Sequence, residues 1–174
     1  MAVGEGTLPP LAPVAGVRLG TVSAGIKTLG RKDLVLMELA QGSTVAGVFT
    51  RNAFCAAPVT VAKEHLAAAA PRYLLVNTGN ANAGTGDSGI ADAQACCQAV
   101  AEAAHVEAAQ VLPFSTGVIG EPLPVDLIRQ ALPQAVIALD ANGWAEAAEG
   151  ILTTDTRPKG CTVHVFLKNR RSTE

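Results

Sequence analysis

Aromatic and charged residues are scarce in this chain. Of its 174 residues, 3% are aromatic and 16% are charged, whereas 49% are hydrophobic. The 13 basic and 15 acidic side chains nearly cancel to a net charge of −2, so no basic excess is present for binding nucleic-acid phosphates. The high apolar fraction also excludes a disordered chain. We therefore expect a globular protein, of a length typical of one domain, that does not bind nucleic acid.

Long apolar runs and metal-ligand clusters are missing as well. No stretch approaches the roughly 20 apolar residues of a membrane-spanning helix, and the Gly- and Pro-rich first eleven residues do not resemble a signal peptide. The three histidines stand alone, without a further ligand at metal-binding spacing. The spacing of the cysteines fits neither a zinc site nor a disulfide framework; they are Cys55, Cys96, Cys97 and Cys161. These features predict a cytoplasmic protein with reduced thiols, no membrane anchor, no metal and no bound cofactor.

Alternating and apolar segments predict strands in the first half of the chain. Residues 17–27 alternate loosely with glycines. The segments 33–39 and 44–50 flank a Gln-Gly-Ser turn, which predicts a hairpin. Residues 58–62 predict a further short strand, and 72–77 form an apolar run typical of a buried strand.

Helical periodicity dominates the second half. It predicts helices over 89–105, 124–132 and 142–151, and alternation predicts a last strand at 162–167. Strands and helices are thus interleaved, which indicates an α/β fold. No repeat and no long linker divides the chain, so we expect residues 1–174 to form a single domain.

Asparagine and small residues are concentrated directly after the buried strand. Residues 77–86 read Asn-Thr-Gly-Asn-Ala-Asn-Ala-Gly-Thr-Gly. Small residues let a backbone approach a ligand closely, and the amides of Asn80 and Asn82 supply donors and acceptors. A phosphate loop would need Lys and Ser or Thr after Gly84, and these are absent. A binding loop and a wide strand-to-helix turn both fit the pattern.

A second polar turn lies within 112–120, where a short strand enters Ser115-Thr116-Gly117. Backbone N–H groups freed at such a turn, together with the Thr116 hydroxyl, are donors suited to the oxyanion of an acyl-transfer intermediate. A bulge or tight turn is the alternative. No Gly-x-Ser-x-Gly elbow is present, which argues against a serine hydrolase.

The third polar segment follows the last predicted helix. Residues 153–159 read Thr-Thr-Asp-Thr-Arg-Pro-Lys and combine hydroxyls, a carboxylate, a guanidinium and an ammonium. Such a cluster can hold a zwitterionic amino acid. A solvated loop with Thr154 or Asp155 closing a turn is the alternative.

These three segments belong to a set of six short motifs. They are 23–27 (Ser-Ala-Gly-Ile-Lys), 46–52 (Ala-Gly-Val-Phe-Thr-Arg-Asn), 57–59 (Ala-Pro-Val), 77–83, 115–120 (Ser-Thr-Gly-Val-Ile-Gly), and 153–156 with Pro158-Lys159. Each is weak alone, but their order and spacing resemble the α-chain half of the ornithine acetyltransferase (glutamate N-acetyltransferase) family, the bifunctional enzymes of arginine biosynthesis. The resemblance covers about residues 1–160.

The resemblance implies an αββα-type sandwich of the kind shared with self-processing aminopeptidases. It implies a precursor that cuts itself into α and β chains, which assemble as an α2β2 heterotetramer. The β chain begins with a Thr whose hydroxyl is the nucleophile and whose α-amine can act as base. The implied reaction moves an acetyl group from N-acetylornithine to glutamate, and some members also accept acetyl-CoA as the donor.

The resemblance also assigns residues. By position, Thr116 and Gly117 match the family's oxyanion-hole pair, and Thr153 matches its substrate-binding Thr. Weaker candidates for the same pocket are Asn80, Asn82, Asp155 and Lys159.

The last residues depart from the family pattern. After the Pro-Lys segment and a strand, the family continues with Lys-Gly-x-Gly-Met, a Pro and Met-Ala before the scissile bond. Here residues 161–174 end in Lys-Asn-Arg-Arg-Ser-Thr-Glu, a divergent or truncated tail. We therefore expect the nucleophile on a separate β chain. The alternatives are a truncated, non-catalytic remnant or binding domain of the same fold, and a self-processing, aminopeptidase-like hydrolase.

An α-chain half that shares its core with a β chain is expected to leave apolar sheet surface uncovered. The segments 73–76 and 45–49 are the expected sources of that surface. Large exposed apolar patches mark interaction surfaces or aggregation liabilities.

Overall fold

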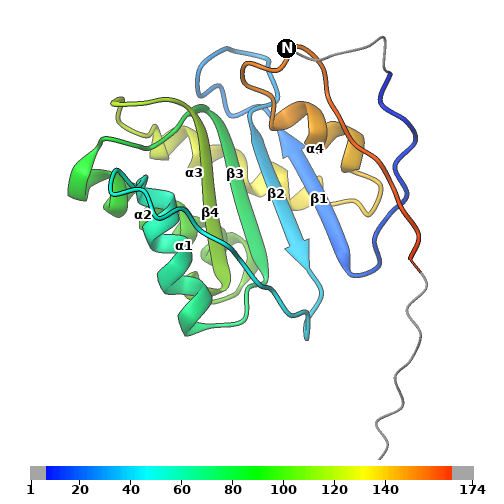
Figure 1. Cartoon of the computed structure of the whole chain (residues 1–174), viewed down its shortest axis with the longest axis horizontal. Coiled ribbons are helices and arrows are strands. Elements are labelled where there is room, and N and C mark those ends of the chain that lie inside the picture. The colour runs from blue at the N-terminus through cyan, green and yellow to red at the C-terminus, as the bar shows by residue number, and fades with distance from the viewer. Residues whose placement is uncertain (1–6, 166–174) are drawn as a thin grey trace, which may run out of the picture.

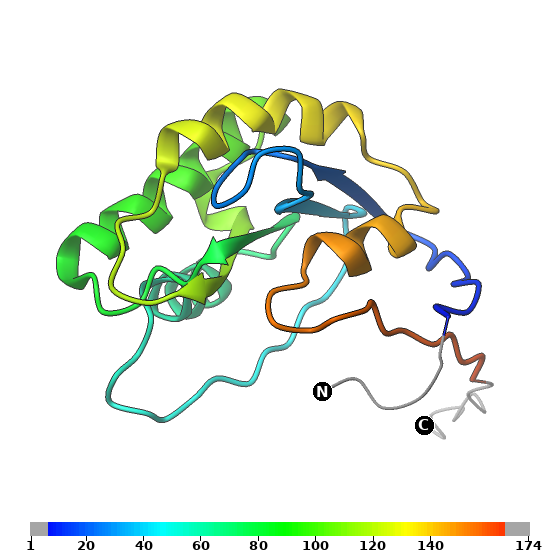
Figure 2. The ribbon, with the colours of Figure 1, turned by 90° about the horizontal axis from the view of Figure 1, so that it is seen from above.

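A computed structural model describes residues 7–165 as a four-stranded sheet with helices on both faces (Figures 1 and 2). The elements are β1 (Val17–Val22), β2 (Leu34–Leu39), α1 (Ala57–Ala68), β3 (Tyr73–Asn80), α2 (Gly86–Ala104), a 3₁₀ turn (Ala108–Gln110), β4 (Val111–Val118), α3 (Val125–Ile137) and α4 (Trp144–Gly150). The predicted α/β class is confirmed.

The sheet has the order β1-β2-β3-β4, antiparallel except for the parallel pair β3 and β4. A parallel pair needs a crossover, and α2 provides it. The C-terminal ends of β3 and β4 therefore lie at one edge of the sheet. The loop of residues 23–33 reaches the same edge, because Leu34 pairs with both Val22 and Asn77.

The back face of the sheet carries the main core. Alternate residues of β2, Leu34 and Leu36, point to this face and are fully buried. Cys97 and Val100 of α2 and Leu132 of α3 pack against them. Helix α3 lies against β1 and β2, whereas the alanine-rich α2 lies against β3 and β4.

The front face, which is toward the viewer in Figure 1, is only partly covered. Helix α4 packs there on Leu19 and Val35. The rest of the face lines a hollow of about 600 Å³ that includes Met37, Val76 and Phe114. Of the segments expected to expose apolar surface, 73–76 contributes Leu74 and Val76 to this hollow, whereas Tyr73 and Leu75 are buried in the back-face core.

Residues 58–62, predicted as a strand, are helical, so that prediction is wrong. They form the first turns of α1, with Pro58 in the first turn, where its missing N–H leaves no helical hydrogen bond unmade. The helix buries Pro58, Val61 and Ala62 and lies beside β4 and α2. Tertiary burial here outweighs the strand preference of Val59 and Val61.

The predicted hairpin is also wrong. Strand β2 is paired on both sides, with β1 and β3, so no free edge remains for residues 44–50. That segment is extended but belongs to no strand. The strand predicted over 17–27 ends at Val22. Of the strand predicted over 162–167, residues 162–165 form no strand, and 166–167 lie outside the described residues. The three predicted helices are present, and α3 continues through Pro133 to Ile137.

We expect the free energy of unfolding to fall as the pH rises from 9 toward 12. Burial raises the pKa of the Cys96 and Cys97 thiols from 9.0 to about 12. In this range the folded chain holds protons that the unfolded chain loses, so each thiol contributes a fall of about 1.4 kcal/mol per pH unit. Below pH 9 both thiols are protonated in both states, and their contribution is constant.

Urea unfolding between pH 8 and 11 measures this fall. Cys97→Ala should make it shallower, whereas the exposed Cys161→Ala should leave it unchanged. Tyr73, whose pKa burial also raises to about 12, contributes equally in all three proteins above pH 10. Identical slopes for Cys97→Ala and the unmodified chain would contradict the prediction.

Candidate functional site

The three polar segments singled out in the sequence meet at one edge of the sheet, where β3 and β4 end (Figure 1). The first two segments are joined directly, because the Ala81 N–H donates to the Val118 carbonyl at 2.8 Å. Two further interactions bring neighbouring residues to the same edge. The Lys27 ammonium lies 3.4 Å from the Glu121 carboxylate, and the Thr78 hydroxyl donates to the Gly150 carbonyl at 3.1 Å. The loop of residues 23–33 is thus a fourth component of the site, in addition to the three polar segments.

Strands β3 and β4 come unusually close at Gly79 and Gly117. Both glycines have positive φ, +98° and +139°, in the region that L side chains rarely adopt. A Cβ on Gly117 would lie only 2.3 Å from the Gly79 carbonyl carbon. The register shifts here, since Asn80 faces both Thr116 and Val118. Thr116 and Gly117 thus lie in the last residues of β4, at a bulge-like irregularity and not in a turn, which is the second of the two alternatives that the sequence allowed.

Thr116 is half-buried and Gly117 is exposed, so the segment predicted to bind an oxyanion lies at the surface of the edge. Two hydrogen bonds join the residues next to this segment. The Ser115 hydroxyl donates to the Asn77 side-chain oxygen at 2.6 Å, and the Asn77 amide nitrogen donates to the Asn80 carbonyl at 2.9 Å. Asn77 is itself buried, which makes this link between β3 and β4 a well-shielded one.

The weaker candidates Asn80 and Asn82 are both buried, and their side-chain amides form hydrogen bonds within the protein. Asn80 donates to the carbonyls of Glu121 and Pro122 at 3.1 and 3.0 Å. Asn82 has a φ of +45° and donates to the Gly89 carbonyl at 2.8 Å, while its side-chain oxygen accepts from Thr85. These amides shape the loop that follows β3. Direct contact of either side chain with a substrate stays a prediction.

Sequence reasoning missed the role of Asp33. Its side chain is 2% exposed, and its two carboxylate oxygens accept the backbone N–H groups of Ala24 at 2.6 Å and Ile26 at 2.7 Å. This fixes the loop that carries Lys27 against β3, where a Cβ on Gly79 would lie 2.8 Å from the Cβ of Lys27. In the sequence, Asp33 is an acid without a visible partner, because its partners are backbone groups.

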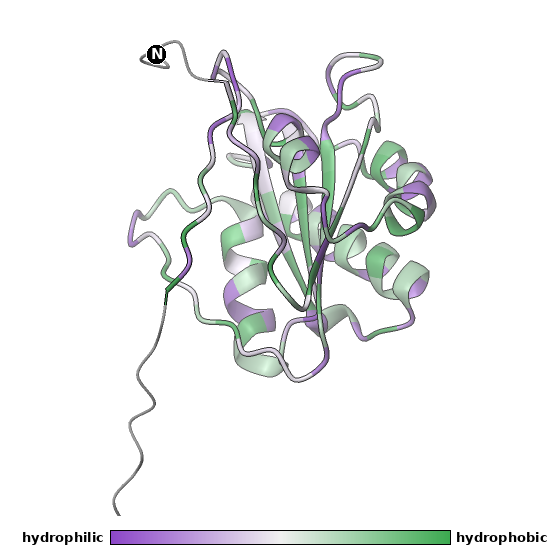
Figure 3. Ribbon diagram, turned by 90° about the vertical axis from the view of Figure 1, so that its right-hand side faces the viewer, coloured by the Kyte–Doolittle hydropathy of each residue, from purple (hydrophilic) through white to green (hydrophobic). Residues whose placement is uncertain are grey.

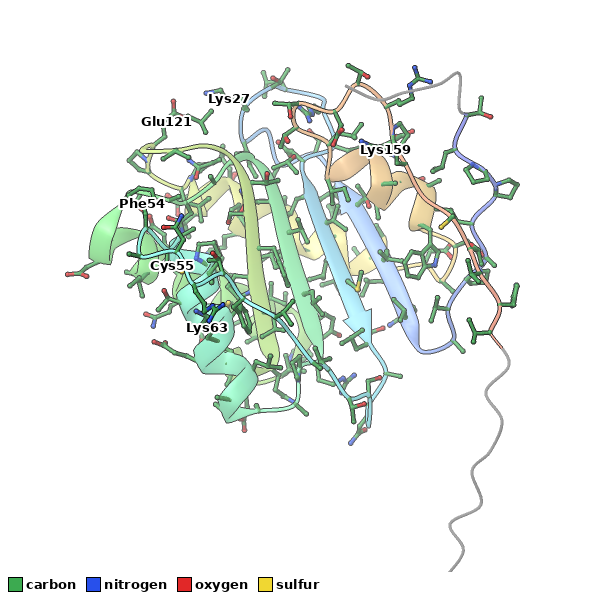
Figure 4. All side chains as sticks on the ribbon, viewed as in Figure 1. Lys27, Phe54, Cys55, Lys63, Glu121 and Lys159 are labelled. Carbon is green, nitrogen blue, oxygen red and sulfur yellow. The ribbon has the colours of Figure 1, made fainter. Side chains whose placement is uncertain are left out.

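Lys27 and Glu121 extend toward each other at the rim of this edge, as Figure 4 shows. Both side chains are about half exposed, so the ion pair adds little to stability. It does place one cation and one anion beside the Gly79–Gly117 contact.

Thr153 is half-buried in a separate hollow of about 520 Å³ that Arg31, Lys32 and Glu149 also line. Its backbone is held from two directions. The Arg31 guanidinium donates to the Leu152 carbonyl, and Thr78, which faces Thr116 across the sheet, binds the end of α4. Thr78 therefore pairs with Thr116 on one side and contacts the end of α4, three residues before Thr153, on the other.

Asp155 and Lys159 form an ion pair with each other, 2.5 Å between carboxylate oxygen and ammonium. The hydrogen bond from Lys159 lowers the pKa of Asp155. Lys159 also borders the front-face hollow. Both side chains are exposed and available to a ligand, and their predicted part in substrate binding stays a prediction.

Within residues 7–165, no three His, Cys, Asp or Glu side chains are grouped so that they could hold a metal ion. Of the helices described, none has the length and apolar character needed to cross a membrane.

Comparison with known proteins places this geometry in a family. The model of the ArgJ family matches residues 18–173. The chain is 60% identical over 160 residues to the arginine biosynthesis bifunctional protein ArgJ of Methylococcus capsulatus, and 61% identical over 162 residues to that of Pseudomonas fluorescens. These matches cover 92% and 93% of this chain but 39% and 40% of the relatives, so the chain spans about two-fifths of their length.

Two solved structures share the fold. Ornithine acetyltransferase from Mycobacterium tuberculosis, in complex with ornithine, superposes with a TM-score of 0.79 at 40% identity, covering 83% of this chain and 79% of that chain. ArgJ from Bacillus halodurans gives a TM-score of 0.74 at 36% identity, over 82% and 74%. The family resemblance inferred from the six motifs is confirmed, and the chain belongs to the ArgJ family.

Proposed function

We propose that this chain is the α-chain part of an acetyltransferase of arginine biosynthesis, which moves an acetyl group from N-acetylornithine to glutamate. The nucleophile is the N-terminal Thr of a β chain, and the assembly is an α2β2 heterotetramer. Family membership and the names of the relatives support this reaction. Acetyl-CoA enters as a second donor substrate, in keeping with the word bifunctional in those names.

The observation that carries the proposal is the close approach of Gly79 and Gly117 at the end of β4, where Gly117 is exposed and Thr116 is half-buried. When the β-chain hydroxyl attacks the acetyl carbonyl, negative charge develops on the carbonyl oxygen. Donors fixed in advance at that position stabilise the transition state without having to reorient. The backbone N–H of Gly117 and the Thr116 hydroxyl take this role, because the contact with Gly79 holds their backbone in place.

Thr153 supplies the substrate pocket in this proposal. It lines a hollow at the same sheet edge together with the cations Arg31 and Lys32 and the carboxylates Glu149 and Asp155. A hydroxyl beside groups of both charges suits an acetylated ornithine, which carries a carboxylate and an ammonium. The ornithine bound in the Mycobacterium tuberculosis structure supports a pocket for such a ligand in this fold.

Replacing Thr116 tests the oxyanion role. The chain is co-expressed with the part of the Pseudomonas fluorescens relative that lies outside the shared region, and formation of N-acetylglutamate from N-acetylornithine and glutamate is measured. Thr116→Ala should lower turnover about 10²- to 10³-fold, the usual effect of losing one oxyanion donor. Its side chain donates to no other described residue, so the free energy of unfolding should change little.

The exposed Thr7→Ala, outside the proposed site segments, is the matched control and should keep full turnover. An unchanged rate in Thr116→Ala would remove Thr116 from the mechanism. Release of acetate without N-acetylglutamate would instead favour the aminopeptidase-like hydrolase, and substrate binding without turnover would favour a non-catalytic remnant.

The proposed site also depends on Asp33, because its carboxylate orders the loop that packs on Gly79. Asp33→Asn keeps one acceptor but turns an NH₂ group toward a backbone N–H. Hydrogen bonds to a charged group contribute about 1.5–3 kcal/mol, so the free energy of unfolding should fall by about 2 kcal/mol. Turnover should also fall, because the loop that Asp33 orders packs on Gly79, and Gly79 contacts Gly117 in the proposed oxyanion site.

Urea unfolding and the acetyl-transfer assay are run on the same preparations. Asp87→Asn makes the same chemical change at an exposed position and should alter both quantities far less. Equal effects of the two substitutions would show that the buried carboxylate does not order the loop.

A further inference from the structure

The Lys27–Glu121 ion pair at the sheet edge is fixed at both ends by buried polar side chains. Asp33, which is 2% exposed, accepts the backbone N–H of Ile26, the residue before Lys27. Asn80, which is 3% exposed, donates to the backbone carbonyl of Glu121. The backbone is therefore held in place at both residues, whereas the two side chains are about half exposed and free to change partner.

Lys27 lies next to the proposed oxyanion site. Its Cβ is 2.8 Å from the position of a Cβ on Gly79, and a Cβ on Gly117 would lie 2.3 Å from the Gly79 carbonyl carbon. Lys27, Gly79 and Gly117 thus follow one another in direct contact. In Figure 4 the side chains of Lys27 and Glu121 extend toward each other above this end of the sheet, and Figure 3, turned to the side, shows hydrophilic stretches in the loops there.

Lys27 is also held more loosely than the neighbouring lysines. Among residues 7–165, the ammonium groups of Lys32 and Lys159 lie 3.0 and 2.5 Å from their nearest carboxylates, whereas that of Lys27 lies 3.4 Å from Glu121. An exposed ion pair of this kind is weak, and the lysine stem is flexible. The Lys27 ammonium can therefore leave Glu121 for the carboxylate of a ligand at small cost.

The charges that line the Thr153 hollow are balanced. They come from two cations and two carboxylates, Arg31, Lys32, Glu149 and Asp155. Acetylated ornithine is balanced in the same way, but glutamate, the acceptor in the proposed reaction, has two carboxylates. Its second carboxylate needs a cation outside this set. Only a few bonds separate that carboxylate from the amine that takes the acetyl group, so the cation must lie close to the oxyanion site.

We propose that Lys27 binds the side-chain carboxylate of the glutamate acceptor, and that Glu121 is the counter-ion that Lys27 leaves to do so. The inference rests on the proposed function and names the residue that selects the acceptor. An ammonium favours glutamate over glutamine, which has nearly the same shape but an uncharged amide. Glu121 opposes binding, because it competes for the ammonium and repels the incoming carboxylate. Removing Lys27 and removing Glu121 should therefore have opposite effects.

Binding of glutamate and glutamine tests the assignment. The chain is co-expressed with the part of the Pseudomonas fluorescens relative outside the shared region, the complex is confirmed by co-elution, and affinities are measured by calorimetry. Lys27→Met keeps an aliphatic stem at Gly79 but removes the charge. It should weaken glutamate binding about ten-fold or more, the usual effect of losing a hydrogen bond to a charged group, and leave glutamine and ornithine binding unchanged. Lys27→Arg should restore most of the preference for glutamate.

Glu121→Gln supplies the measurement of opposite sign. It should tighten glutamate binding about two- to five-fold, because the Lys27 ammonium is released from a weak exposed pair. A merely structural ion pair would give weaker binding in both variants. Lys63→Met and Glu64→Gln make the same chemical changes at exposed positions of α1, toward the opposite end of the sheet, and should leave binding unchanged. All five variants should melt like the unmodified chain.

An unchanged preference for glutamate over glutamine in Lys27→Met would overturn the inference, and so would weaker glutamate binding in both Lys27→Met and Glu121→Gln. The inference also fails if no complex forms, or if the unmodified complex does not bind glutamate more tightly than glutamine.

The acetyl-transfer assay on the same complexes separates this inference from the proposed function. Transfer to glutamate that is equally efficient in Lys27→Met overturns the role of Lys27 and leaves the proposed function standing. Glutamate binding that depends on the Lys27 charge, without transfer, supports the role of Lys27 and counts against the proposed function.

Discussion

The contact between Gly79 and Gly117 is the constraint on which the site depends. Two strands of a sheet ordinarily keep their side chains clear of each other's backbone, but here the position of a Cβ on one strand is filled by the backbone of the other. Only glycine satisfies both this approach and the positive φ values. For this reason the backbone at Gly117 packs directly against the backbone at Gly79, with no side chain between them.

Buried polar groups, rather than apolar packing, hold the loops around that contact. Small residues leave no side chains to interlock, so the amides of Asn77, Asn80 and Asn82 and the carboxylate of Asp33 bind backbone groups instead. Each such buried group must be satisfied, since an unpaired one costs about 1–3 kcal/mol. Alternative loop conformations lose several of these bonds together, which makes the arrangement specific as well as stable.

The sequence was informative where structure is local and misleading where it is not. Periodicity located β2, β3, α2 and α3 to within a few residues. The predicted hairpin of 33–39 with 44–50 is wrong because the turn residues near Gly42 indicate that the chain bends, but not which strand pairs with β2. Both edges of β2 are paired, one with β1 and the other with β3. The partners of Asp33 stayed hidden for a related reason: a carboxylate that binds backbone N–H groups leaves no complementary residue type in the sequence.

The two faces of the sheet explain why the site lies where it does. Alternation in β2 and β3 makes both faces apolar, and α2 and α3 cover the back face while α4 covers only part of the front. The loop that follows α4 belongs to both regions, because Lys159 borders the front-face hollow while Thr153 and Asp155 line the hollow beside Arg31. In the proposed assembly, a β chain that covers the front face therefore also reaches the loop that carries Thr153. Covering the front-face hollow would bury Phe114 of β4, two residues before Thr116, so the partner would lie next to the proposed oxyanion donors.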